Sequence, residues 1–331
     1  MKSTTANALK TIVFLAFGVG LLYWAFRKMD MSDVLAALKN ANYLWVFAAF
    51  MCGVLSHLSR AIRWRYLLEP MGYDVKIKHS FFAVMSGYLM NYIVPRLGEV
   101  SRCAMINRTD KVPFEKLIGT VVVERIVDLL MTALISATIL FTQYDLLSGF
   151  IAGMTGSTPS IGFMVMLILI AMIGLGVFLL ILKNRESLSK RPWLHKLFSF
   201  WDGILEGLKS ILALKKIGWF LFHSFFIWTM YFMMSWLVFY SIPGTSMLGV
   251  DAGLTVLLAG TLAIIIPVPG GVGTFHTIVP AALLLYGVSE VDGLTYALIS
   301  HSTQMLMIFL IGGISLFLGG AIARKNLKIL S

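Results

Sequence analysis

The sequence predicts an all-α membrane protein with about six spanning helices plus two re-entrant hairpins in an inverted-topology repeat. Of its 331 residues, 58% are hydrophobic and only 13% are charged, whereas a soluble domain carries about 25% charged residues. Apolar runs of about 20 residues, the length that crosses a bilayer, recur along the chain. Two further apolar runs are broken by proline and glycine. A water-soluble globule is therefore excluded, and so is a barrel of short alternating strands.

Six apolar segments have the length of a spanning helix. They cover residues 11–26, 43–64, 115–141, 161–182, 217–240 and 294–322. The first ends in Phe26-Arg27-Lys28 and has no small-residue cleavage site. We therefore expect it to remain as a span and not to be removed as a signal peptide.

Two shorter apolar segments, residues 80–94 and 250–266, run into helix breakers. The first meets Pro95 and Gly98, and the second meets a loop that contains two prolines and three glycines. Each is followed by another short helical segment, which is typical of a re-entrant hairpin. We predict such hairpins near residues 80–108 and 250–286.

The positions of Lys and Arg predict the side of the membrane on which each connection lies, because short basic loops stay in the cytoplasm. Residues 60–116 hold 10 of the 27 basic residues and residues 183–216 hold 8, whereas 142–160 and 241–249 hold none. This pattern indicates a multi-pass protein of the cytoplasmic (inner) membrane with both termini inside. The net charge of +11 then faces anionic lipid headgroups, and no nucleic-acid partner is expected.

This topology divides one membrane domain, residues 1–331, into two opposed halves. A span and an interfacial segment, 1–42, precede the first half, 43–182, whose hairpin enters from the cytoplasm. An interfacial helix over 183–216 leads to the second half, 217–322, whose hairpin enters from outside. Opposed hairpins indicate an inverted repeat, and such repeats place substrate sites near the membrane midplane.

The strongest chemical signal is the charged turn Glu124-Arg125-Ile126-Val127-Asp128 inside the third span. Each ionisable side chain at the centre of a span costs about 2.5–3.5 kcal/mol on insertion scales. Glu124 and Asp128 share a helix face, and one further cation would neutralise the turn. Two interpretations follow: a buried ion-pair network that fixes helix packing, or a polar cavity that handles a lipid headgroup or protons.

The tip of the first predicted hairpin combines Asn91, Pro95, Arg96 and Glu99. Proline ends one half-helix, and the first amides of the next half-helix attract anions. Arg96 is interpreted either as a bidentate grip on a phosphate or as a side chain that extends to the membrane surface.

Two arginines, Arg60 and Arg63, stand at the cytoplasmic end of the second span. Such residues either anchor a span at the membrane surface or recruit an anionic lipid. We expect a surface position for Arg63, where its role is largely electrostatic.

The loop of the second hairpin contains Gly270, Gly271 and Gly273, followed by His276. Three glycines expose backbone amides and let other segments approach closely. The loop lacks the Gly-Lys-Ser/Thr of a nucleotide-binding loop and the preceding strand of a dinucleotide-binding turn. His276 is interpreted either as lining the same cavity as the charged turn or as a buried structural histidine.

Enzyme signatures are absent from the sequence. It contains no His-Glu-x-x-His, no Gly-x-Ser-x-Gly and no Cys/His cluster with metal-ligand spacing. Arginines and carboxylates without a nucleophile favour binding and translocation over bond cleavage. We expect no enzyme activity, no cofactor and no metal.

Four motifs, in this order, resemble the lysylphosphatidylglycerol synthase transmembrane, or flippase-like, family. They are Arg60-x-x-Arg63-Trp64, Gly87-Tyr88-x-x-Asn91-x-x-x-Pro95-Arg96-x-Gly98-Glu99-x-x-Arg102, Glu124-Arg125-x-x-Asp128 and Pro267-x-Pro269-Gly270-Gly271-x-Gly273. In the bifunctional enzymes of this family the membrane part is regarded as a lipid flippase, and a soluble C-terminal domain makes the lipid. Because Ser331 follows directly after the last predicted span, the resemblance implies the flippase-like role and not the synthase activity.

These observations predict a flippase-like protein that translocates or binds a phosphate-bearing lipid, either a phospholipid or a polyprenyl-linked lipid. The expected midplane site, closed by the 267–276 loop, consists of Arg96, Glu99, Glu124, Arg125 and Asp128. Two alternatives remain open. One is an ion-coupled secondary transporter of a small solute, and the other is a non-transporting membrane partner of a cell-envelope synthase or glycosyltransferase.

Overall fold

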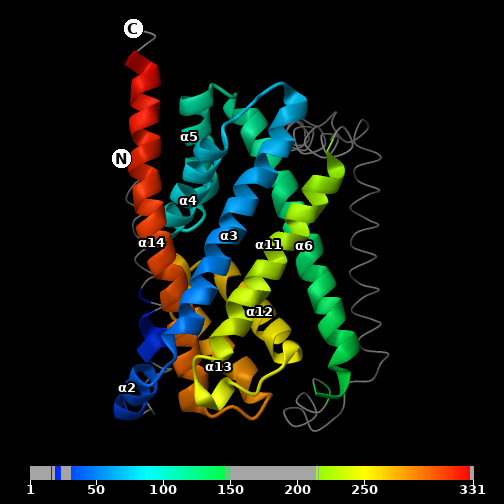
Figure 1. Ribbon diagram of the computed structural model, residues 1–331, viewed down its shortest axis with the longest axis vertical. Coiled ribbons are helices and arrows are strands. Elements are labelled where there is room, and N and C mark those ends of the chain that lie inside the picture. The colour runs from blue at the N-terminus through cyan, green and yellow to red at the C-terminus, as the bar shows by residue number, and fades with distance from the viewer. Residues whose placement is uncertain are drawn as a thin grey trace, which may run out of the picture.

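The computed structural model describes residues 31–146 and 216–328, together with residues 16, 19–23, 148 and 214. Every regular element in this part of the chain is helical (Figure 1). Three of its helical segments are long and apolar enough to cross a membrane: Tyr43–Met71, Ile217–Phe239 and Glu290–Arg324. The predicted all-α membrane class is confirmed. Of the predicted segment 11–26 only residues 16 and 19–23 are described, and the predicted segments 161–182 and 183–216 lie almost entirely outside the described residues.

The long helices correspond closely to the predicted spans. They are α3 (Tyr43–Leu68), α6 (Phe114–Thr142), α11 (Ile217–Phe239) and α14 (Glu290–Lys328), and a short helix α2 (Met31–Lys39) precedes them. Asn42 begins α3, because its side chain accepts a hydrogen bond of 3.1 Å from the backbone amide of Leu44. Short 3-10 turns, η1 (Glu69–Met71) and η2 (Pro243–Thr245), follow α3 and α11.

Each broken apolar segment forms a helical hairpin. The first consists of α4 (Ile77–Ile93) and α5 (Leu97–Asp110), and the second of α12 (Val250–Ile265) and α13 (Thr274–Leu284), joined through η3 (Pro269–Gly271). The two hairpins lie in opposite halves of the long axis of the molecule (Figure 1). The predicted helix breaks at Pro95 and Pro267 are confirmed. The number of spans, the inverted repeat and the division into halves 43–182 and 217–322 stay predictions.

Each hairpin packs into its own hydrophobic core. The first core joins α3, α4, α5 and α6 and includes Trp64, Val84 and Ile106. The second joins α11, α12, α13 and α14 and includes Phe239 and Phe275. Because lipid is as apolar as these side chains, close packing and not water exclusion holds such cores together.

The tips of the two hairpins meet each other in the interior of the molecule. The ring of Tyr92, near the end of α4, lies against Gly270 in η3, so closely that any side chain at Gly270 would collide with it. The backbone of Gly270 has φ 63, a left-handed conformation that glycine adopts without strain. The tips of the two hairpins are therefore in direct contact.

Candidate functional site

A buried ion-pair network joins α3 to α6. Arg60 Nη1 lies 2.9 Å from Asp128 Oδ2. Arg63 Nη2 lies 3.1 Å from Asp128 Oδ1 and 3.4 Å from Glu124 Oε1. The side chains of Arg63 and Glu124 are both fully buried. The expectation that Arg63 lies at the membrane surface is therefore wrong, because two carboxylates of α6 hold its charge inside the helix bundle.

The first hairpin extends this network through α5. Arg102 Nη2 lies 2.6 Å from Glu124 Oε2, and its guanidinium carbon lies 4.7 Å from the ring centre of Trp64, within the range of a cation–π interaction. Arg102 was not among the predicted site residues. The Glu99-x-x-Arg102 spacing could have revealed it, because residues three apart on a helix share a face.

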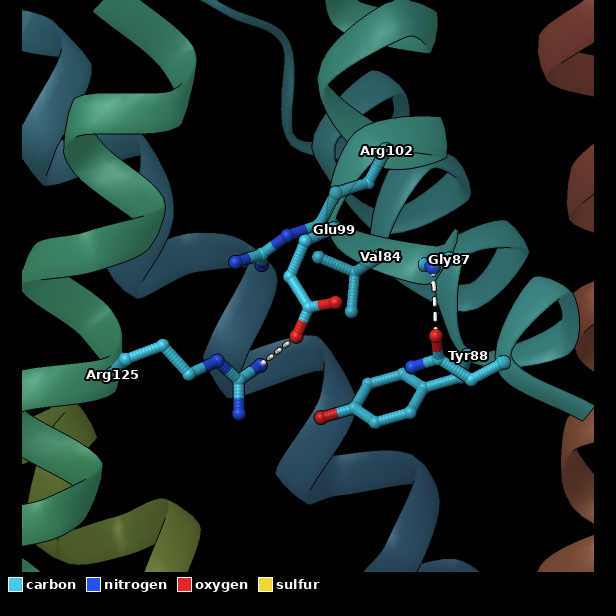
Figure 2. A pocket seen from close by; sticks show the side chains of 8 residues that line it. Val84, Gly87, Tyr88, Glu99, Arg102 and Arg125 are labelled. Carbon is cyan, nitrogen blue, oxygen red and sulfur yellow. Dashed lines mark hydrogen bonds and ion pairs between the residues drawn. The ribbon is translucent and has the colours of Figure 1, made fainter. Parts of the chain in front are cut away.

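The network opens onto a pocket between the first hairpin and α6. Its lining residues are Val84, Gly87, Tyr88, Asn91, Gly98, Glu99, Arg102 and Arg125. Figure 2 shows Glu99 of α5 and Arg125 of α6 directed toward each other, with 3.5 Å between Glu99 Oε1 and Arg125 Nη2. Arg125 Nη1 also lies 3.8 Å from Asp128 Oδ2. The Arg125 side chain is 51% exposed and that of Glu99 29%, so this pair is the accessible end of the network.

Close backbone contact shapes the floor of the pocket. Asn91 Oδ1 accepts a hydrogen bond of 2.7 Å from the backbone amide of Gly98. A Cβ atom at Gly87 would lie 2.8 Å from the carbonyl oxygen of Gly98, closer than real side chains come. The pair of glycines lets α4 and α5 touch, and Asn91 fastens the hairpin turn from inside.

Arg96 does not join this network. It is the residue before α5, with φ 65, and it is exposed. No ion pair of Arg96 with another described residue is found. Because the left-handed backbone at Arg96 carries the turn itself, the side chain points out of the hairpin and the neighbouring Glu99 and Arg102 take the inner face of α5. The expected convergence of Arg96 with Glu124, Arg125 and Asp128 is not seen.

The second hairpin contributes a separate polar cluster. Gly270, Gly271 and Gly273 all have positive φ. His301 of α14 bonds the carbonyl oxygen of Gly270 through Nε2 at 2.8 Å, and the rings of His276 and His301 are 4.9 Å apart. Among the described contacts, none joins this cluster to the arginines. The loop meets the first hairpin through Tyr92 instead.

The charges of the network do not cancel. Four guanidinium groups, from Arg60, Arg63, Arg102 and Arg125, face three carboxylates, from Glu99, Glu124 and Asp128. One formal positive charge is left over in an environment where unpaired charge is costly. An anion in the pocket would complete the pairing. A cluster of three or more potential metal ligands is not found within the described part of the chain.

The apolar helices long enough to cross a membrane, the proline-broken hairpins and the buried arginine–carboxylate network together indicate the class of the protein: it is a helical integral membrane protein. Residues 11–312 match the family described as the lysylphosphatidylglycerol synthase TM region, and the chain belongs to this family. The resemblance of the four sequence motifs to this family is thereby confirmed.

Two curated relatives share part of the chain. A segment of 131 residues is 28% identical to the UPF0104 membrane protein MJ1595 of Methanocaldococcus jannaschii, covering 39% of this chain and 38% of that protein. A segment of 113 residues is 29% identical to glycosyltransferase AglD of Haloferax volcanii, covering 34% of this chain and 18% of that protein. The chain thus matches well under half the length of either relative.

Proposed function

We propose that the protein translocates phosphate-bearing lipids across the cytoplasmic membrane and binds their headgroups in the pocket between the first hairpin and α6. The observation that carries this proposal is the surplus positive charge of the network, which reaches the pocket at the half-exposed Arg125. A buried network that served helix packing alone would have no need of an excess cation at an open pocket.

The geometry supports a bidentate grip on the phosphate. Arg125 has only long ion pairs, 3.5 and 3.8 Å, to Glu99 and Asp128, so a phosphate can replace them with shorter charge-assisted hydrogen bonds. The enclosed room in the pocket is about 20 Å³, enough for about one water molecule. A phosphate would therefore enter by separating Glu99 from Arg125, while the acyl or prenyl chains stay in the bilayer.

The remaining charged groups support the grip. Arg60, Arg63 and Arg102 are buried and already paired, so they position the carboxylates of α6 and contribute positive potential. Two opposed hairpins that open alternately would carry the headgroup across the membrane. The role is that of a transporter and not of an enzyme.

Replacing Arg125 with lysine tests this grip. We expect Arg125→Lys to leave expression and stability near wild type and to reduce transport of labelled phosphatidylglycerol at least about tenfold, because one lost charge-assisted hydrogen bond is worth about 1.5–3 kcal/mol. Leaflet exchange in proteoliposomes, followed by dithionite quenching, measures the rate.

The matched control is Arg96→Lys, an exposed arginine at the tip of the same hairpin, which should transport at the wild-type rate. A labelled glycolipid without phosphate should not be moved by either protein. Equal losses in both lysine variants would contradict a specific grip by Arg125, and equal transport of the phosphate-free lipid would contradict recognition of phosphate.

Cysteine labelling tests the proposed orientation, in which both termini and the basic connections are cytoplasmic. Met247, 93% exposed after η2, and Lys111, exposed after α5, lie at opposite ends of the hairpin pair. In a background with Cys52 and Cys103 changed to alanine, Met247→Cys should react with an impermeant maleimide in intact cells and Lys111→Cys only after lysis. The reverse pattern would overturn the proposed orientation, and labelling of both sites from the same side would overturn the opposed hairpins.

The match to AglD favours a second candidate, a membrane partner of a glycosyltransferase. In that role the pocket would hold a lipid-linked phosphate for an enzyme and would not move it. The two candidates separate in the same proteoliposomes. Saturable lipid binding without leaflet exchange, together with faster turnover by a co-reconstituted polyprenyl-phosphate glycosyltransferase, would support the partner role.

A further inference from the structure

A pair of buried histidines lies beneath the tip of the second hairpin, apart from the arginine network. His276 on α13 is 6% exposed and His301 on α14 is 1% exposed. Their ring centres are 4.9 Å apart with an interplanar angle of 73°, and the ring of Phe275 stacks on His301 at 4.9 Å. The pair is therefore packed and shielded from water.

The hydrogen bond of His301 fixes where its proton is. A carbonyl oxygen accepts and cannot donate, so Nε2 of His301 carries the hydrogen in its 2.8 Å bond to Gly270. In the neutral ring Nδ1 then holds a free lone pair. Neither Nδ1 of His301 nor Nδ1 of His276 has a hydrogen-bond partner among the described residues. Nδ1 of His301 is thus a buried basic nitrogen without a proton donor, and Nδ1 of His276 is buried and unpartnered beside it.

No compensating charge faces the pair in the described part of the chain. The nearest carboxylates on α14, Glu290 and Asp292, precede His301 by about 14–17 Å at 1.5 Å per residue. Among the described residues, no ion pair or hydrogen bond joins either ring to a charged group: His301 bonds Gly270, and the two rings pack against each other and against Phe275. Asp251, at the start of α12, is exposed. Other titratable groups of the packed helices contact different residues, among them Tyr296 on α14, Tyr92 on α4, His57 and Arg60 on α3, Tyr231 on α11, Tyr240 just after α11 and Tyr286 after α13.

This isolation distinguishes the pair from the other buried histidines, His57 and His79. His79 lies 2.9 Å from the carboxylate of Asp110. His57 packs against Tyr88 and stands one turn from Arg60, so a proton there would add a second positive charge beside a guanidinium. The histidine pair has no cation beside it, but burial without a counter-charge disfavours a proton while the rings are packed as observed. One ring can accept a proton and share it with the other when the second hairpin opens to water and the edge-to-face packing gives way to an N–H···N bond.

We infer that the His276–His301 pair is a proton-binding site that couples lipid movement to the proton gradient. Its mechanical link to the pocket is short. His301 holds Gly270, Gly270 touches Tyr92, and Tyr92 follows Asn91, which fastens the first hairpin at the pocket floor. A proton enters from water on the side to which the second hairpin opens, shifts the tip, and leaves on the other side. The transport half of this inference rests on the proposed function.

The substitution His301→Gln separates proton binding from tip packing, because the glutamine amide can donate to Gly270 but does not titrate near neutral pH. In vesicles of phosphatidylcholine containing labelled phosphatidylglycerol, the wild type should shift the leaflet distribution of the label about tenfold per unit of imposed pH difference, as expected for one proton per lipid. His301→Gln should equilibrate the label without responding to the gradient. His276→Gln leaves the bond to Gly270 intact and should behave in the same way. It is a second test that does not depend on whether His301→Gln folds.

His223→Gln serves as the control, since His223 bonds Ser59 at the α3–α11 contact and should retain the wild-type response. A full response in both pair variants would overturn the proton site. If no variant moves lipid, the proposed function fails and nitrogen NMR of histidine-labelled protein decides the site alone. A proton bound by His276 or His301 between about pH 5 and 8, around the ordinary histidine pKa, supports it, and two rings that stay neutral overturn it.

Discussion

Replacing Glu124 with glutamine should lower the free energy of unfolding by about 3–5 kcal/mol, the usual cost of stranding a buried charge. Glu124 is fully buried, and it is the one carboxylate that Arg102 contacts among the described residues. Glutamine has nearly the same shape, so packing is kept while the charge is lost. The network would then hold four guanidinium groups against two carboxylates. Thermal unfolding of the purified protein in detergent measures the loss.

A mutant cycle with Arg102 shows whether charge pairing is the cause. The double variant Glu124→Gln/Arg102→Met returns the network to its original surplus of one charge and should be more stable than Glu124→Gln alone. Arg125→Met makes a useful comparison, because its half-exposed side chain should cost less than about 1 kcal/mol. Costs that simply add in the double variant would mean that the two groups act independently.

Helix positions could be predicted because their signals are local. Apolar length located α3, α11 and α14, and the breakers at Pro95 and Pro267 located both hairpin turns within a few residues. A hairpin break needs no partner to be recognised, since proline stops a helix through its own ring and missing amide hydrogen.

The site could be predicted only in part, because the residues that pair in it lie far apart in the sequence. Glu124 and Asp128 could be predicted as site residues, because a carboxylate inside an apolar span needs a partner. The sequence predicts Arg60 and Arg63 at the cytoplasmic boundary, either as surface anchors or as recruiters of an anionic lipid, because basic residues at the end of an apolar run are typical of that boundary. In fact α3 continues to Leu68, and carboxylates more than 60 residues away neutralise both arginines inside the bundle.

The tips illustrate the same limit. Sequence placed Arg96 and Glu99 together at one turn, but the left-handed backbone at Arg96 sends its side chain outward. The pairing of His276 with His301 joins two helices and depends on how α13 packs on α14, which hydropathy does not encode. The backbone conformation at a turn and the packing between helices depend on the folded structure, so the local sequence does not predict them.

Replacing Gly270 with valine should disrupt the contact between the two hairpins. A β-branched side chain pays about 1–2 kcal/mol for the left-handed backbone, and its collision with the Tyr92 ring adds about 1–3 kcal/mol of overpacking. We expect the variant to unfold at lower temperature and to lose most lipid transport, because the tips can no longer close on each other.

Gly287→Val is the matched control, since Gly287 has a similar φ of 73 but no neighbouring atom within 4 Å of a Cβ. It should carry the backbone strain without the collision and should keep its transport rate. Adding Tyr92→Ala should recover the overpacking part of the loss in Gly270→Val and recover nothing in Gly287→Val. Equal stability and equal transport in the two valine variants would show that strain alone acts at Gly270. The contact between the tips would then be a consequence of packing and not the link through which one hairpin moves the other.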